Sequence, residues 1–157
     1  MKTQSTRQAF SLVEITVALG VAAISLLAVF SLVPIGLQTN QRAIEETASL
    51  DILSVVAADL HATPPRGRAN SLQFGIAVPS NPVTSSPPAT ELFFSNVGQF
   101  ASSQQPDSRY RVTITFLPNG GGARTATFVG LKVTWPTGAA ITNAQGSAEM
   151  FAAFDRN

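Results

Sequence analysis

The chain has 157 residues, 45% of them hydrophobic and 12% charged, and this length suits one domain rather than two. Past residue 37 it carries eight basic and eight acidic residues, so that part is formally neutral and lacks the basic surface that general nucleic-acid binding requires. The absence of cysteine excludes disulfides, zinc fingers, thiol catalysis and lipid anchoring through an N-terminal cysteine.

The N-terminal quarter changes character abruptly after residue 9. Residues 1–9 (MKTQSTRQA) are polar and carry two positive charges, Lys2 and Arg7, without an acid. Residues 10–37 are almost wholly apolar, and their one charge is Glu14. This run is long enough for the ~20 residues with which a helix spans a bilayer. The two basic residues predict a cytoplasmic N-terminus, with the chain past residue 37 on the other side.

Three ordinary explanations of the apolar run stay open from its composition. It fits a secretory signal peptide, a plain signal anchor for an unrelated domain, or the buried helix of a soluble protein. The first is disfavoured, because the run exceeds the ~7–15 apolar residues of a signal peptide and no A-x-A-like cleavage site follows it.

Glu14 is the residue that bears on these alternatives. A carboxylate costs about 2.5–3.5 kcal/mol at mid-membrane on insertion scales, and less near the interface. Its position early in the expected helix recovers only about 0.3–1 kcal/mol from the helix dipole. We therefore expect a cationic group to meet Glu14.

The string AFSLVE at residues 9–14, after a short basic leader and before a long apolar helix, resembles the processing site of type IV pilins and type II secretion pseudopilins. In that family a prepilin peptidase cuts before the Phe on the cytoplasmic side and methylates the new amino terminus. The resemblance implies cleavage between Ala9 and Phe10 and N-methylation of Phe10. The family usually has Gly before the cut, so we expect Ala9, the nearest small substitute, to slow the processing.

The resemblance also implies an assembly charge pair. Cleavage would create an ammonium group at Phe10, and the Glu14 of a neighbouring subunit would neutralise it when helices pack side by side. Such a pair fixes the axial register of the subunits, and removing one partner of a buried pair costs about 3–5 kcal/mol. The retained Glu14 argues against the tip pseudopilin type, which characteristically lacks that acid.

The implied partners are prepilin peptidase, other pilin or pseudopilin subunits, and membrane lipid. The implied location is the inner (cytoplasmic) membrane, crossed once, with the N-terminus in the cytoplasm and the C-terminal domain outside, followed by a filament.

The helical pattern continues beyond the apolar run. Pro34 and Gly36 predict a kink or a loosened turn near residues 31–36. We expect the helix to end at residues 61–63, before a Pro-Pro pair. One apolar stripe recurs at spacings of three and four: Ile44, Ala48, Ile52, Val55, Val56 and Leu60. Four acids are interpreted as the solvated face of this helix: Glu45, Glu46, Asp51 and Asp59.

Past residue 63 the pattern predicts strands and loops. Strands are expected at residues 72–78, 91–95, 110–117, 123–135 and 146–154. Residues 79–90 form a loop rich in proline and serine, and residues 118–122 (PNGGG) predict a hairpin turn. The expected class is α+β and pilin-like, with a leader (1–9), a transmembrane half-helix (10–37), an extracytoplasmic half-helix (38–63) and an antiparallel sheet domain (64–157).

The sequence contains no recognisable active site. His61 is the only histidine, and no G-x-S-x-G nucleophile motif occurs. Arg109 and Arg111, with Arg66 and Arg68, are interpreted as charges on an exposed strand edge rather than as a binding patch. We therefore expect no enzyme activity, no metal, no cofactor and no small-molecule substrate.

The favoured function is a structural subunit, a minor pilin or pseudopilin of a type IV pilus or a type II secretion filament. Two alternatives remain. One is a pilus-associated subunit that captures a surface, a cargo or DNA. The other is a signal-anchored periplasmic enzyme.

Overall fold

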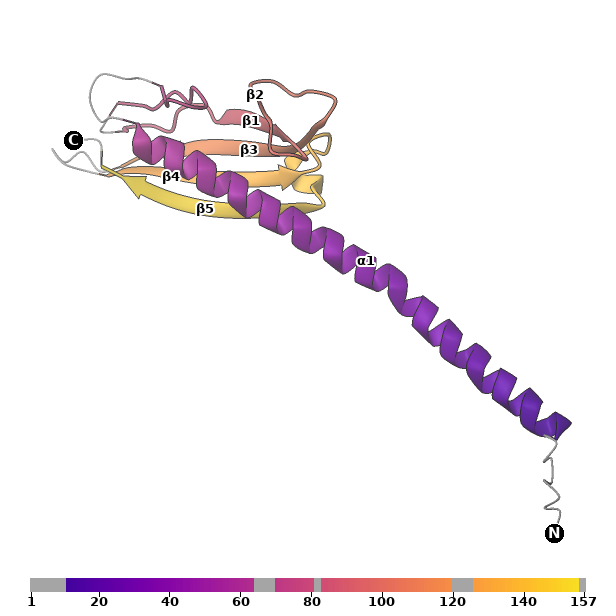
Figure 1. The fold of residues 1–157 in the computed structure, drawn as a ribbon. Coiled ribbons are helices and arrows are strands. Elements are labelled where there is room, and N and C mark those ends of the chain that lie inside the picture. The colour runs from indigo at the N-terminus through magenta and orange to yellow at the C-terminus, as the bar shows by residue number, and fades with distance from the viewer. Residues whose placement is uncertain (1–10, 64–69, 81–82, 120–125, 156–157) are drawn as a thin grey trace, which may run out of the picture. The chain divides into compact units, whose positions relative to one another are not determined.

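The computed structural model describes residues 11–63, 70–80, 83–119 and 126–155. Within these ranges it has one long helix and a five-stranded antiparallel sheet, which confirms the α+β class (Figure 1). The elements are α1 (Leu12–Ala62), β1 (Thr90–Ser95), β2 (Phe100–Ala101), β3 (Ser108–Leu117), β4 (Thr127–Trp135), a short 3-10 helix η1 (Ile141–Asn143) and β5 (Gly146–Phe154). The chain divides into two compact units, Met1–Ala43 and Ile44–Asn157.

Helix α1 includes Pro34 in its interior. Proline has no N–H, so the carbonyl of Phe30 loses its donor in the next turn, and this loss is why a kink was expected. The kink itself stays a prediction. The helix ends at Ala62, within the range that the Pro-Pro pair predicts.

In the second unit, α1 lies across one face of the sheet (Figure 1). The contact is apolar, and the helix and strands β3 and β4 supply many of its most deeply buried side chains: Leu53, Val56, Leu60, Val112, Ile114, Val129, Leu131 and Val133. The predicted helical stripe needs a correction, because Ile44 and Val55 are exposed and Leu53 is buried in their place. The face of the helix that is buried is therefore rotated slightly from the face that the predicted stripe marks.

The strands lie in the order β2-β1-β3-β4-β5, and all neighbours are antiparallel. Strand β3 alternates as predicted: Tyr110, Val112, Ile114 and Phe116 are buried, and the residues between them are half-buried. This period of two follows from the pleat, which turns successive side chains to opposite faces.

The prediction of a strand at residues 72–78 is wrong. The structure has only an isolated bridge there, Asn70↔Ala77. Gly75 takes a positive φ of 66°, and the Ser71 hydroxyl accepts the N–H of Ile76 at 3.0 Å. These local bonds make a turn, although its side chains at Phe74, Ile76 and Val78 join the core as strand side chains would.

Two further boundaries differ from the prediction. Strand β4 begins at Thr127, and the short edge strand β2 was not predicted. Of the expected hairpin turn at residues 118–122, the last three residues lie outside the described part of the chain. The antiparallel pairing of Leu117 with Phe128 agrees with a hairpin connection between β3 and β4.

Candidate functional site: the apolar segment of helix α1

The N-terminal part of α1 buries nothing within the chain's own fold. Every described side chain from residue 11 to residue 44 is exposed, including fifteen large apolar ones between Leu12 and Leu37. The helix is long and apolar enough to span a membrane, by length and composition. Each such side chain forgoes about 1.5–3 kcal/mol while it stays in water, so this surface needs an apolar environment supplied from outside the fold.

The hydroxyl groups of this segment are satisfied within the helix. Thr16 donates to the carbonyl of Val13 at 2.9 Å, and Ser25 donates to that of Val21 at 2.8 Å. Ser31 likewise donates to a carbonyl one turn earlier, at 2.7 Å. These bonds let the hydroxyls enter hydrocarbon without a free donor.

Glu14 is the charged residue of this otherwise apolar segment. It lies in the first turn of α1, and its side chain is exposed. No residue in the described ranges forms a hydrogen bond or an ion pair with it. A carboxylate in an apolar segment is costly without a partner, and the described residues supply none.

The other predicted residues of this site fall into two groups. Lys2, Arg7, Ala9 and Phe10 lie outside the described residues, so the cleavage site and the Phe10–Glu14 pair stay predictions. Gly36 lies on the helix with no atom within 4 Å of a Cβ built there, so no neighbour within the chain requires a glycine.

Asp59 corrects the interpretation of the four acids. It is 6% exposed, and its two carboxylate oxygens accept the backbone N–H groups of Gln73 (2.9 Å) and Phe74 (3.1 Å). The carboxylate therefore fastens the turn after the helix onto the helix end. A signal was present in the sequence, since Asp59 is three residues after Val56 and seven after Ile52 and so shares their face.

Glu45 and Arg109 form an ion pair between α1 and β3, so neither is a free surface charge. Beside them, Tyr110 is buried. Burial raises the pKa of its phenol above 10.0, the Glu45 carboxylate raises it further, and Arg109 opposes the shift. The pair is partly solvated, so its own contribution to stability is small.

The strand-edge interpretation of Arg109 and Arg111 is wrong, because β3 is an interior strand flanked by β1 and β4. Arg111 donates to the carbonyls of Thr137 and Ala139 and thereby ties the loop after β4 to the sheet. Arg66 and Arg68 lie outside the described residues.

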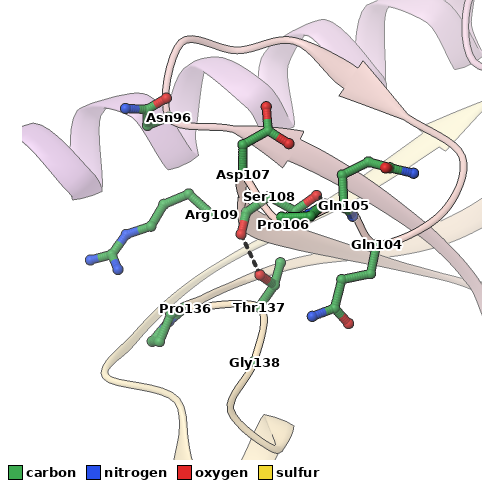
Figure 2. Close-up of a pocket in the computed structure, with 10 residues that line it drawn as sticks. All are labelled: Asn96, Gln104, Gln105, Pro106, Asp107, Ser108, Arg109, Pro136, Thr137 and Gly138. Atoms are coloured by element: carbon green, nitrogen blue, oxygen red, sulfur yellow. Dashed lines mark hydrogen bonds between the residues drawn. The ribbon is translucent and has the colours of Figure 1, made fainter.

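A hollow of about 500 Å³ opens where the loops after β1, β2 and β4 meet the start of β3 (Figure 2). Its polar side chains come from Asn96, Gln104, Gln105, Asp107, Ser108, Arg109 and Thr137. The Arg109 and Gln105 side chains extend in opposite directions in Figure 2. Its charged lining residues are one carboxylate, Asp107, and one cation, Arg109. The described residues also contain no group of three or more potential metal ligands.

No protein-family model, no curated protein and no solved structure matches this chain. The features of the chain that bear most directly on its function are the apolar helix and the carboxylate within it.

Proposed function

We propose that this chain is a structural subunit, a minor pilin or pseudopilin, of a type IV pilus or a type II secretion filament. One observation carries the proposal: the exposed apolar helix at residues 12–37 holds a single carboxylate, Glu14, that has no partner among the described residues. The helix-on-sheet architecture of the second unit is compatible with a pilin.

The apolar segment would first serve as a membrane anchor. Fifteen large exposed apolar side chains are stable in hydrocarbon, and the hydroxyls of Thr16, Ser25 and Ser31 are already bonded within the helix and so do not oppose insertion. The basic leader residues Lys2 and Arg7 favour an orientation with the N-terminus in the cytoplasm and the domain past residue 43 outside. The membrane would be the inner (cytoplasmic) one.

Processing would then prepare the same segment for assembly. Prepilin peptidase would cut between Ala9 and Phe10 and methylate the new amine of Phe10. In a filament, the apolar helices of neighbouring copies replace lipid around one another. The amine of one subunit then meets Glu14 of the next in a low-dielectric environment, where an unpaired charge is strongly disfavoured.

The pairing gives Glu14 a registry role. Apolar surfaces slide along one another at little cost, whereas a buried charge must sit at one axial position to meet its counter-charge. A polar residue in an apolar interface is known to select register in this way. The stagger of subunits in the fibre would therefore be set at Glu14, within an interface that is otherwise apolar.

Substitution of Glu14 tests this role. In Glu14→Ala we expect normal membrane insertion but poor incorporation into filaments, since an uncompensated amine costs about 3–5 kcal/mol, equivalent to roughly 100-fold or more in an equilibrium constant. The measurement is the ratio of filament-associated to membrane-associated protein, by quantitative immunoblotting of sheared and membrane fractions.

The matched control is Glu46→Ala, which removes an exposed acid from the same helix outside the apolar segment. It should leave the ratio unchanged. Normal incorporation of Glu14→Ala would show that the carboxylate has no registry role.

A further inference from the structure

We propose that Thr84, Ser85 and Ser86, in the loop before β1, form an O-glycosylation site. Their hydroxyl groups would accept a sugar from an activated sugar diphosphate. The site lies in the second unit of the chain, apart from the apolar segment, and goes beyond the filament role.

The local sequence predisposes this loop to an extended backbone. Residues 83–90 read VTSSPPAT, and the two prolines each fix φ near −65° and restrict the residue before them to extended conformations. Proline-rich segments of this kind form no internal hydrogen bonds. No helix or strand is assigned from Val83 to Ala89. Such a segment enters an enzyme cleft without unfolding, and serine–threonine tracts with proline are typical of O-glycosylated chains.

Both ends of the loop are fastened to the fold. The Val83 N–H donates to Asn119 Oδ1 at 2.5 Å, and the Asn119 N–H donates to the Val83 carbonyl at 3.0 Å. The Val83 side chain is 3% exposed. At the other end, Thr90 pairs with Ile114 in the sheet. The six residues between these anchors are therefore held on the surface.

The three hydroxyls are accessible and uncommitted. Thr84, Ser85 and Ser86 are exposed, and none of the residues that the structure describes forms a hydrogen bond with their side chains. Other hydroxyls in the same unit form hydrogen bonds that hold the fold. The Ser95 hydroxyl accepts two backbone N–H groups, and the Thr63 hydroxyl donates to the backbone carbonyl of Asp59. Three adjacent free hydroxyls beside a Pro-Pro pair are more than a connecting loop requires.

The transfer forms one bond and breaks another. A hydroxyl oxygen of the loop attacks the anomeric carbon of the sugar, and a new C–O bond forms there. The bond between that carbon and the diphosphate breaks, and the diphosphate leaves with the bonding electron pair. The hydroxyl proton passes to a base of the separate transferase, which this chain does not supply.

The test uses the full chain purified from the cells in which it occurs naturally. Trypsin releases residues 69–109 as one peptide, because no Lys or Arg lies between Arg68 and Arg109. Mass spectrometry with electron-transfer fragmentation should find sugar on one or more of residues 84–86. A single sugar would indicate a nucleotide-linked donor, and a uniform oligosaccharide a lipid-linked one; both support the site.

The triple variant Thr84→Val, Ser85→Ala, Ser86→Ala should lose the modification entirely and keep its thermal unfolding midpoint. The matched control is Ser102→Ala with Ser103→Ala, which removes two exposed serines from the same tryptic peptide but outside the loop with the Pro-Pro pair, and should keep the sugar. An unmodified peptide, phosphate in place of sugar, or sugar that persists in the triple variant would each overturn the proposal.

Discussion

At the scale of single residues, Asp59 is an acidic residue that stabilises the fold through two hydrogen bonds. Its carboxylate lies at the end of α1 and replaces, for the two N–H groups of Gln73 and Phe74, the strand partners that this segment lacks. A buried N–H left without an acceptor costs about 1–3 kcal/mol. Asp59 therefore fixes a turn whose side chains fill one end of the core.

We expect Asp59→Ala to lower the free energy of unfolding by about 1–3 kcal/mol, because it orphans the buried Phe74 N–H. Asp59→Asn should lose less, since its amide oxygen retains one acceptor. The measurement is urea denaturation followed by circular dichroism. Asp51→Ala, an exposed acid on the same helix, should change stability by no more than about 0.5 kcal/mol. Equal effects at the two positions would contradict the role of Asp59.

Tyr110 should make the stability of the fold depend on pH in the alkaline range. Burial, and then the Glu45 carboxylate, raise its pKa above 10.0, so the unfolded chain ionises before the folded one does. The free energy of unfolding should be insensitive to this group below pH 10.0 and should fall above it.

Tyr110→Phe should remove that fall when the two proteins are compared by denaturant unfolding across this range. Tyr110 is the only tyrosine, so the absorbance of its phenolate follows the ionisation directly. A phenol that titrates at or below 10.0 in the folded protein would refute the burial argument.

At the scale of elements, β4 and β5 are joined by close packing of aromatic rings on glycines. A Cβ on Gly130 would lie 3.3 Å from the Phe151 ring, and a Cβ on Gly146 only 2.2 Å from the Trp135 ring. Trp135 and Gly146 pair directly across the two strands, so the indole occupies the space that a side chain at residue 146 would need. The absence of a side chain at residue 146 therefore allows the Trp135 ring to lie there.

We expect Gly146→Ala to displace Trp135 and to destabilise the protein by about 1–3 kcal/mol, the usual range for overpacking. Trp135 is the only tryptophan, so its fluorescence should shift to longer wavelength as it becomes more exposed. Gly138→Ala is the control, because a Cβ there meets nothing within 4 Å. Unchanged fluorescence and stability in Gly146→Ala would contradict this packing, because the Trp135 ring would then not need the space at residue 146.

The same scale explains what the sequence predicted well and what it did not. Strand β3 alternates apolar and polar residues over its length, and both its faces follow from that pattern. Residues 72–78 alternate similarly, but their hydrogen bonds go to Asp59, to Ser71 and to one bridge instead of to a neighbouring strand. Alternation indicates which side chains are buried but not which groups the backbone bonds to, and for this reason the strand prediction at residues 72–78 was wrong.

At the scale of the whole molecule, the sequence predicted the fold class but not the ion pairs and charged hydrogen bonds that join its elements. A long apolar run before alternating segments was enough for a helix and an antiparallel sheet. The pairing of Glu45 with Arg109 joins residues 64 positions apart, and the bonds of Arg111 to the loop after β4 depend on strand order. Such contacts depend on the tertiary arrangement, and no local spacing encodes them.

Two halves of contrasting chemistry define the molecule. Residues 12–37 expose apolar side chains and one carboxylate, whereas the second unit has its own buried core between residues 49 and 154. A chain with its own folded core has no internal use for the first segment. We infer that membrane and filament provide the environment for it.

The most direct test of that inference is the mass of the mature N-terminus of the protein isolated from its native cells. We predict that residues 1–9 are absent and that the chain begins at Phe10 with one methyl group on its amine. A chain that retains Met1 would contradict the account, because the Phe10 amine proposed to meet Glu14 would never form. A chain cut after residue 30 would contradict it as well, because it would have lost Glu14 itself.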